Sequence, residues 1–185
     1  MFAESCCFIG HRDIEITPEL TQKVTVIVEG LIKEGVTRFI FGSRSEFNDL
    51  CHEVVTRLKE KYPQIVRIKY STKSEAPVYE SEREELEESL SKVLHEEVHL
   101  AAHEEIYKPE IMFSSGKASY IERNEIMIDN SDCCVFYYDE DYKPKQKIVS
   151  DKSVGKTLTS LNSGTALAFA YAVCKKKRVF NVFIK

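Results

Sequence analysis

The chain has 185 residues, of which 43% are apolar, and a net charge of -4. This length supports one substantial core and is short for two, so we expect a single domain over residues 1–185. The acidic balance argues against nucleic acid as a partner, because nucleic-acid-binding proteins usually carry a basic surplus. No apolar run is long enough to span a membrane, and the N-terminus lacks the apolar region of a secretory signal, so we expect a cytoplasmic protein without membrane association.

The first part of the chain predicts strands and helices in alternation. Thr17 is a typical N-cap and Pro18 a typical first helical residue, and the helix that they open ends before Gly35. Short apolar runs without polar alternation are typical of buried strands. We expect strands at residues 6–9, 38–41 and 65–70, and helices at residues 18–33 and 47–61.

The second part continues this alternation less regularly. Ser81 and Glu84 form a capping box that opens an acidic helix. Residues 98–102 fit either a continuation of this helix or a short strand. The polar segment 139–161 is too long for an ordinary connection, so we expect a lid or an excursion there. The other expected elements are helices at 118–128 and 166–174 and strands at 133–138 and 178–184.

This order of elements predicts an α/β fold with a mainly parallel sheet and helices on both faces. In such a sheet, ligands bind where the carboxyl ends of strands meet the amino ends of helices. Three polar segments fall at this edge. They are Gly10-His11-Arg12 after the first strand, Gly42-Ser43-Arg44-Ser45 after the second, and Ser163-Gly164-Thr165 at the start of the last helix.

The last of these segments is typical of an anion site. With Ser163 as N-cap and Gly164 letting a ligand approach the backbone, unpaired N–H groups at the helix start face outward, and phosphate is their commonest ligand. The alternative is that Ser163 only caps a buried helix. At the first segment, Gly10 permits a tight turn, Arg12 could bind phosphate through two hydrogen bonds, and His11 could donate to a ligand oxygen or brace the loop.

One further group of polar residues lies on a predicted helix. Tyr120, Arg123 and Asn124 are three and four positions apart, so they share a helix face. An arginine held beside apolar core residues is well placed to bind an anion. The alternative is a surface arginine that pairs with Glu122 or Glu125, although adjacent helical positions do not face each other.

The cysteines are expected to be small core residues rather than metal ligands or disulfides. Four lie in strand-like runs and two in helical runs: Cys6, Cys7, Cys133, Cys134, Cys51 and Cys174. Adjacent strand residues point to opposite faces, which does not suit a zinc knuckle.

A second metal hypothesis rests on two histidines. His95 and His99 have the spacing of a zinc protease helix, with Glu96 as general base, but no clear third ligand follows. If residues 98–102 form a strand, the helical geometry is lost. We predict no metal and no cofactor.

Three segments together carry a family resemblance: Cys7-Phe8-Ile9-Gly10-His11-Arg12-Asp13, Tyr120-Ile121-Glu122-Arg123-Asn124-Glu125-Ile126-Met127-Ile128-Asp129, and Ser131-Asp132-Cys133-Cys134-Val135. With them the chain resembles the YpsA-like branch of the SLOG superfamily, named for the Smf/DprA DNA-processing proteins and the Lonely Guy cytokinin-activating enzymes. The resemblance implies a Rossmann-like fold and favours a strand at 98–102. It also implies a nucleotide-type ligand near Gly10, Arg12, Arg123, Gly164 and Thr165.

The sequence departs from these relatives at a catalytic position. Lonely Guy enzymes cleave an N-glycosidic bond with an arginine matched by Arg123 and a glutamate in the helix after their glycine-rich loop. Here that helix reads Ala166-Leu167-Ala168, so the matching acid is absent. Glu46 also stands where relatives often carry a glycine.

We therefore expect a protein that binds a nucleotide or a nucleotide derivative, as a sensor or an enzyme. One alternative is an N-glycosidic hydrolase of nucleoside monophosphates that uses Asp49 or Asp139, and another is a zinc hydrolase; a homo-oligomer is left open. The candidate binding residues are Gly10, His11, Arg12, Gly42, Ser43, Tyr120, Arg123, Asn124, Ser163, Gly164 and Thr165.

Overall fold

The computed structural model describes residues 3–42, 45–70, 98–100, 105–108, 117–142 and 163–184. In this part of the chain, one sheet has the strand order β4-β5-β3-β2-β1-β6-β7, and every pairing is parallel except β4 against β5. The predicted α/β class with a mainly parallel sheet is confirmed. The strands are β1 (Ser5–Gly10), β2 (Arg38–Phe41), β3 (Val66–Tyr70), β4 (Val98–Leu100), β5 (Glu105–Lys108), β6 (Cys133–Tyr137) and β7 (Arg178–Asn181).

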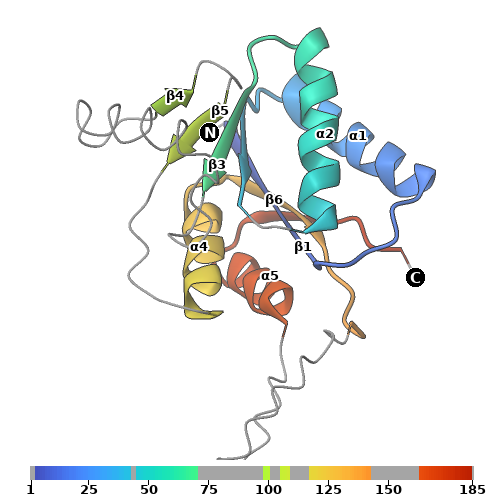
Figure 1. The fold of residues 1–185 in the computed structure, drawn as a ribbon, viewed down its shortest axis with the longest axis vertical. Coiled ribbons are helices and arrows are strands. Elements are labelled where there is room, and N and C mark those ends of the chain that lie inside the picture. Colours follow the sequence, from blue (N-terminus) through green and yellow to red (C-terminus); the bar gives the residue numbers. More distant parts are fainter. Residues whose placement is uncertain are drawn as a thin grey trace, which may run out of the picture.

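Helices cover both faces of this sheet (Figure 1). The helices α1 (Pro18–Lys33) and α2 (Glu46–Lys61) cover one face, and α4 (Lys117–Asp129) and α5 (Gly164–Cys174) cover the other. Successive β1 residues join different cores: Cys6 packs with α1 and α2, whereas Cys7 packs with α4 and α5. This explains why β1 is apolar at every position, since both of its faces are buried.

The helix boundaries follow the local signals in the sequence. Thr17 caps α1 by accepting a hydrogen bond from the backbone N–H of Leu20 (3.2 Å). Gly35 has a φ of +107°, a left-handed conformation that favours glycine after a helix. The helix α2 begins at Glu46, one residue before the predicted start, because Ser45 is its N-cap.

The structure differs from the expected elements at the sheet edge and at one cysteine. Residues 98–100 form strand β4, which settles their ambiguity in favour of a strand, and the neighbouring strand β5 was not predicted. Cys174 is exposed at the end of α5, so its placement in the core was wrong, while the other cysteines are buried. The expected helix after Ser81, and residues 143–161 of the expected lid, lie outside the described residues.

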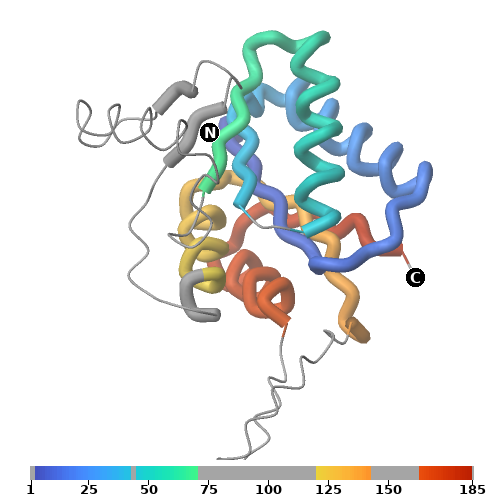
Figure 2. The backbone as a smooth tube through the Cα atoms, in the orientation of Figure 1, coloured from blue at the N-terminus to red at the C-terminus, as the bar shows by residue number. Residues whose placement is uncertain are grey.

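The path of the backbone can be followed in Figure 2. None of the helices in the described ranges is long and apolar enough to cross a membrane. The single domain over residues 1–185 and the cytoplasmic location stay predictions.

Candidate functional site

The strand order fixes where a ligand site is expected. From the interior strand β1 the chain passes to β2 and β3 on one side, and it later adds β6 and β7 on the other. The order reverses between β1 and β6, and the crevice outside the carboxyl ends of two such strands is the usual ligand site of an open parallel sheet. His11 directly follows β1, and Tyr138 directly follows β6.

His11 joins these two strand ends. Its side chain is buried, and its Nε2 lies 3.0 Å from the backbone nitrogen and 3.2 Å from the carbonyl oxygen of Asp139. Depending on the ring tautomer, Nε2 accepts from the N–H or donates to the carbonyl oxygen. Nδ1 of the same ring has no hydrogen-bond partner among the described residues. In a neutral ring it is a donor when Nε2 accepts and an acceptor when Nε2 donates. Burial lowers the pKa of His11 and thereby favours the neutral ring. The hydrogen bond and the charge of Asp139 act in the opposite direction but are weaker. His11 therefore braces the loop after β6, and its Nδ1 has no partner among the described residues.

The loop after β1 is fastened to the first turn of α2. The backbone N–H of Glu46 donates to the carbonyl oxygen of Arg12 (2.9 Å), and the backbone N–H of Ile14 donates to Oε2 of Glu46 (2.6 Å). The side chain of Arg12 itself is exposed. Glu46, which the sequence analysis did not include among the site residues, thus holds the loop that presents Arg12 to solvent. An acid in a first helical turn was the signal that could have found it.

Gly10 is required for a different reason than the predicted tight turn. A Cβ at this position would lie 2.4 Å from Cδ1 of Phe47, far inside van der Waals contact. Among the described glycines, Gly35 is the one with a positive φ, so Gly10 needs no special backbone conformation. The glycine is there because α2 packs directly against the end of β1.

Gly42 has a similar role at the end of β2. A Cβ there would lie 2.3 Å from Sδ of Met127 and 3.0 Å from Cδ of Arg123. The structure therefore brings the end of β2 and the face of α4 together. Ser43 lies outside the described residues.

On the predicted polar face of α4, Arg123 and Asn124 are buried and Tyr120 is half-buried. Arg123 is buried, and its Cζ lies 5.3 Å from the ring centre of Tyr120. Asn124 is also buried, and its Oδ1 has no hydrogen-bond partner among the described residues. Tyr120 and Arg123 are thus in contact.

The start of α5 has the predicted N-cap. Oγ of Ser163 accepts a hydrogen bond from the backbone N–H of Ala166 (3.1 Å), and Thr165 is buried. Unlike Gly10 and Gly42, Gly164 has no described residue, apart from its own helix turn and chain neighbours, within 4 Å of the place where a Cβ would stand. Because α5 follows β6, its first turn lies at the carboxyl edge of the sheet.

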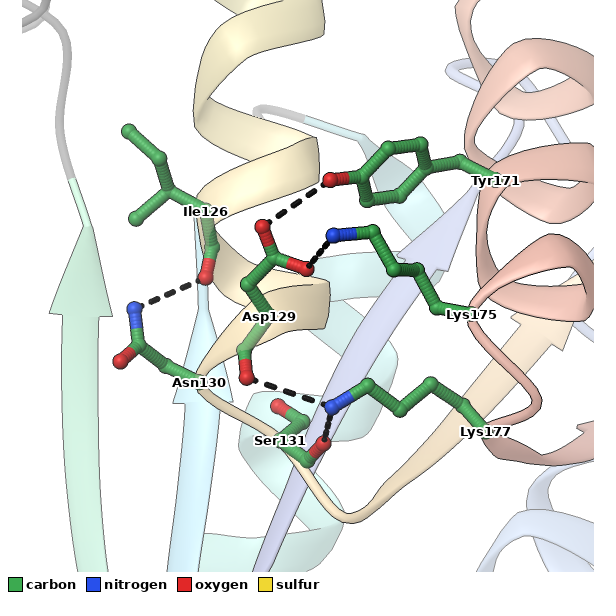
Figure 3. Close-up of polar contacts among 7 residues, drawn as sticks. All are labelled: Ile126, Asp129, Asn130, Ser131, Tyr171, Lys175 and Lys177. Atoms are coloured by element: carbon green, nitrogen blue, oxygen red, sulfur yellow. Dashed lines mark hydrogen bonds and ion pairs between the residues drawn. The ribbon is translucent and has the colours of Figure 1, made fainter.

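The end of the motif from Tyr120 to Asp129 lies elsewhere, beside the end of α5 (Figure 3). Asp129 forms an ion pair with Lys175 (3.0 Å between Oδ1 and Nζ) and accepts a hydrogen bond from the hydroxyl of Tyr171 (2.9 Å). Nζ of Lys177 donates to the carbonyl oxygens of Asp129 (3.2 Å) and Ser131 (2.6 Å). These contacts hold α4 and α5 together away from the ligand edge.

Asp132 has a comparable structural role at the amino ends of β1 and β6. Its Oδ2 accepts hydrogen bonds from the backbone N–H of Glu4 (2.8 Å) and from the backbone N–H (3.0 Å) and hydroxyl (2.9 Å) of Ser5. Burial acts to raise the pKa of Asp132, but these bonds outweigh it and hold the pKa below its usual value. The three segments that carry the family resemblance therefore contain two kinds of residue. Some lie at the carboxyl edge of the sheet, and others, such as Asp129 and Asp132, join helices or strands.

The acids proposed for catalysis differ in position. Asp139 is beside His11 at the edge, whereas Asp49 is exposed on α2. Ala168, near the place where hydrolase relatives carry an acid, is buried in the core.

The zinc hypothesis loses its helical geometry. His99 lies in strand β4, and His95 lies outside the described residues. Within the described ranges, no group of three or more histidine, cysteine or acidic side chains could hold a metal ion.

A separate groove of about 620 Å³ runs between α1 and α2, with Thr21, Val54 and Leu58 among its lining residues. It contains none of the predicted binding residues.

The fold and its edge define a Rossmann-like protein. Residues 10–163 match the model of the YspA SLOG family, and the chain belongs to this family. The fold is similar to a solved structure of DNA processing protein A from Helicobacter pylori, described for its single-stranded DNA binding mode, with a TM-score of 0.54 and 17% identity. The match covers 96% of this chain and 64% of that protein. None of the curated proteins matches the chain.

This comparison corrects one expectation. The acidic balance of the chain predicts no nucleic-acid partner, but a protein of similar fold has a single-stranded DNA binding mode. Net charge describes the whole surface and does not report on one edge of the sheet, so the exclusion of nucleic acid was wrong.

Proposed function

We propose that this chain binds a nucleotide or nucleotide-derived phosphate at the carboxyl edge of its sheet, as a sensor or an enzyme. The observation that carries the proposal is the contrast among three glycines. Packing accounts for Gly10 and Gly42, whereas at Gly164, a helix start, no residue of the described ranges packs against the Cβ position. A glycine that packing does not require, beside outward N–H groups, is what close approach of a phosphate needs.

Two further features support the proposal. Arg12 is exposed on a loop that Glu46 fixes, and an arginine can bind phosphate through two hydrogen bonds. The SLOG family membership supports a ligand of this type. The remaining predicted binding residues stay part of the proposal as candidates.

The test is calorimetric titration of the Gly164→Ala variant with adenosine monophosphate. The added methyl group has room in the free protein, so the fold should keep its stability while the phosphate is held away from the backbone. We expect affinity to fall at least about tenfold. Gly30→Ala is the matched control, since Gly30 also has no atom within 4 Å but lies within α1. Wild-type affinity in the Gly164→Ala variant would contradict the proposal.

A second candidate function is cleavage of the N-glycosidic bond. Asp139, which lies beside His11 at the edge, is a better candidate for the catalytic acid than Asp49 on α2. Without the acid that relatives carry, a loss of about 10²- to 10⁴-fold is typical for a missing general acid or base. We therefore expect adenosine monophosphate to remain largely intact on incubation. Free base above the no-enzyme control, lost in an Asp139→Asn variant, would instead identify a hydrolase.

Single-stranded DNA is the other ligand to test, because the similar Helicobacter pylori protein has a binding mode for it. A titration with a short oligonucleotide at two salt concentrations would detect this, since binding through phosphates weakens steeply as salt rises. Binding of the oligonucleotide but of no mononucleotide would favour the DNA-handling function.

A further inference from the structure

A tyrosine ring covers one face of His11. The ring centres of His11 and Tyr142 are 3.8 Å apart, and the planes differ by 13°, which is a parallel stack. Tyr142 is half-buried, whereas His11 is 1% exposed. The stacked pair lies beside the point where the strand order reverses.

Tyr142 reaches His11 from a short turn after β6. The backbone N–H of Tyr142 donates to the carbonyl oxygen of Asp139 (3.3 Å), and Oδ1 of Asp139 accepts from the backbone N–H of Asp141 (2.9 Å). The contacts between this turn and the loop after β1 include the hydrogen bonding of Asp139 to His11 and the ring stack. Tyr142 lies outside the paired residues of β1 and β6, so a movement of its ring away from His11 would leave the pairing of these strands intact.

The surroundings of the stack are aromatic as well. Tyr138 lies 6.1 Å from His11 between ring centres and is itself stacked on Phe169 of α5, at 4.6 Å. Nδ1 of His11 lies at the ring edge, so a planar ligand on the ring face would leave this nitrogen available for a hydrogen bond with the ligand. A flat ring beside a polar group is the arrangement that recognises a nucleobase.

We propose that the face of His11 is the base subsite of the ligand edge, and that a nucleobase takes the place of the Tyr142 ring when a nucleotide binds. This inference rests on the proposed nucleotide function. A purine presents a larger aromatic surface than a phenol ring, so the exchange replaces one stack with a more extensive one. The phosphate of the same ligand would remain with Gly164 and Arg12.

The test compares adenosine monophosphate with ribose 5-phosphate, which lacks the base. In a Tyr142→Ala variant no ring competes for His11, so adenosine monophosphate should bind about two- to tenfold more tightly, while ribose 5-phosphate should bind as it does to the wild type. Tyr142→Phe keeps the ring and should retain wild-type affinity for both. Weaker binding of adenosine monophosphate to Tyr142→Ala would overturn the inference, because Tyr142 would then contact the base rather than give way to it.

A second measurement uses the wild-type chain and does not depend on a variant. In NMR spectra, the nuclear Overhauser effects between ring protons of His11 and Tyr142 should disappear at saturating adenosine monophosphate. Nuclear Overhauser effects between His11 and the base protons should replace them. Persistence of the Tyr142 contacts at saturation would overturn the inference alone. If neither adenosine monophosphate nor ribose 5-phosphate bound to the wild type or to Tyr142→Ala, the proposed function would be wrong, and so would this subsite.

Discussion

Arg123 of α4 occupies the space beside Gly42 at the end of β2: a Cβ on Gly42 would lie 3.0 Å from Cδ and 3.1 Å from Nε of Arg123. The absence of a side chain at position 42 therefore gives the arginine its path past the strand end. This is a contact between residues far apart in the sequence, and it connects two segments that the sequence analysis had placed at one site for separate reasons.

Gly42→Ala should destabilise the protein by about 1 to 3 kcal/mol, the range for inserting a methyl group into a packed site. The methyl group would collide with Sδ of Met127. Gly30→Ala should instead stabilise it by about 0.5 to 1 kcal/mol, because Gly30 is in a helix interior with open space. Urea unfolding measures both. Equal stability of Gly42→Ala and the wild type would show that Met127 moves aside at no cost.

Arg123→Ala should weaken adenosine monophosphate binding by about 1.5 to 3 kcal/mol, the range for a charge-assisted contact. Calorimetric titration checks this, with a thermal unfolding curve to establish that the variant is folded. Arg57→Ala is the control, since Arg57 is an exposed arginine beside the groove between α1 and α2. A folded Arg123→Ala variant with unchanged affinity would remove Arg123 from the site.

Local patterns were sufficient for much of the fold. Caps and apolar runs located α1 at its observed bounds and β2 at its observed residues. They also located the segments after β1 and β2 and at the start of α5. The reason is that capping and burial on both faces of a strand leave signatures within a few neighbouring residues.

Contacts between distant segments left no such signature. The need for Gly10 comes from Phe47, and the structural role of Asp132 comes from Ser5. The exposure of Cys174 depends on which side of α5 the sheet covers, and the helix is apolar along most of its length. These properties follow from tertiary packing, which a single sequence does not record locally.

Asp132→Asn should lower the free energy of unfolding by about 1 kcal/mol at pH 7. The effect is small because Asp132 is exposed and solvent screens its interactions. The folded-state pKa of Asp132 is below its unfolded value of about 3.9, so its contribution is complete above that pH and is lost as pH falls through the folded-state pKa. The difference between variant and wild type in urea unfolding should therefore shrink in strong acid. A difference that is independent of pH would mean that the carboxylate charge is not involved.

His11 should make stability depend on pH at higher values. Because burial lowers the pKa of His11 in the folded state, the unfolded chain takes up this proton first, below about pH 6.5. Wild-type stability should be greatest above that pH and decline as pH falls toward the folded-state pKa of His11. His11→Gln cannot titrate there, so its urea midpoint should change less between pH 7.5 and 5.5, and parallel curves for the two proteins would contradict this.

The most direct measurement for the nucleotide site is an amide chemical-shift titration of the isotope-labelled chain with adenosine monophosphate. The account predicts the largest shifts at His11, Arg12, Gly164 and Thr165, with small shifts at Gly30 in α1. Shifts concentrated at Thr21 and Leu58 in the groove between α1 and α2, or no shifts at millimolar ligand, would contradict a nucleotide site at the carboxyl edge of the sheet.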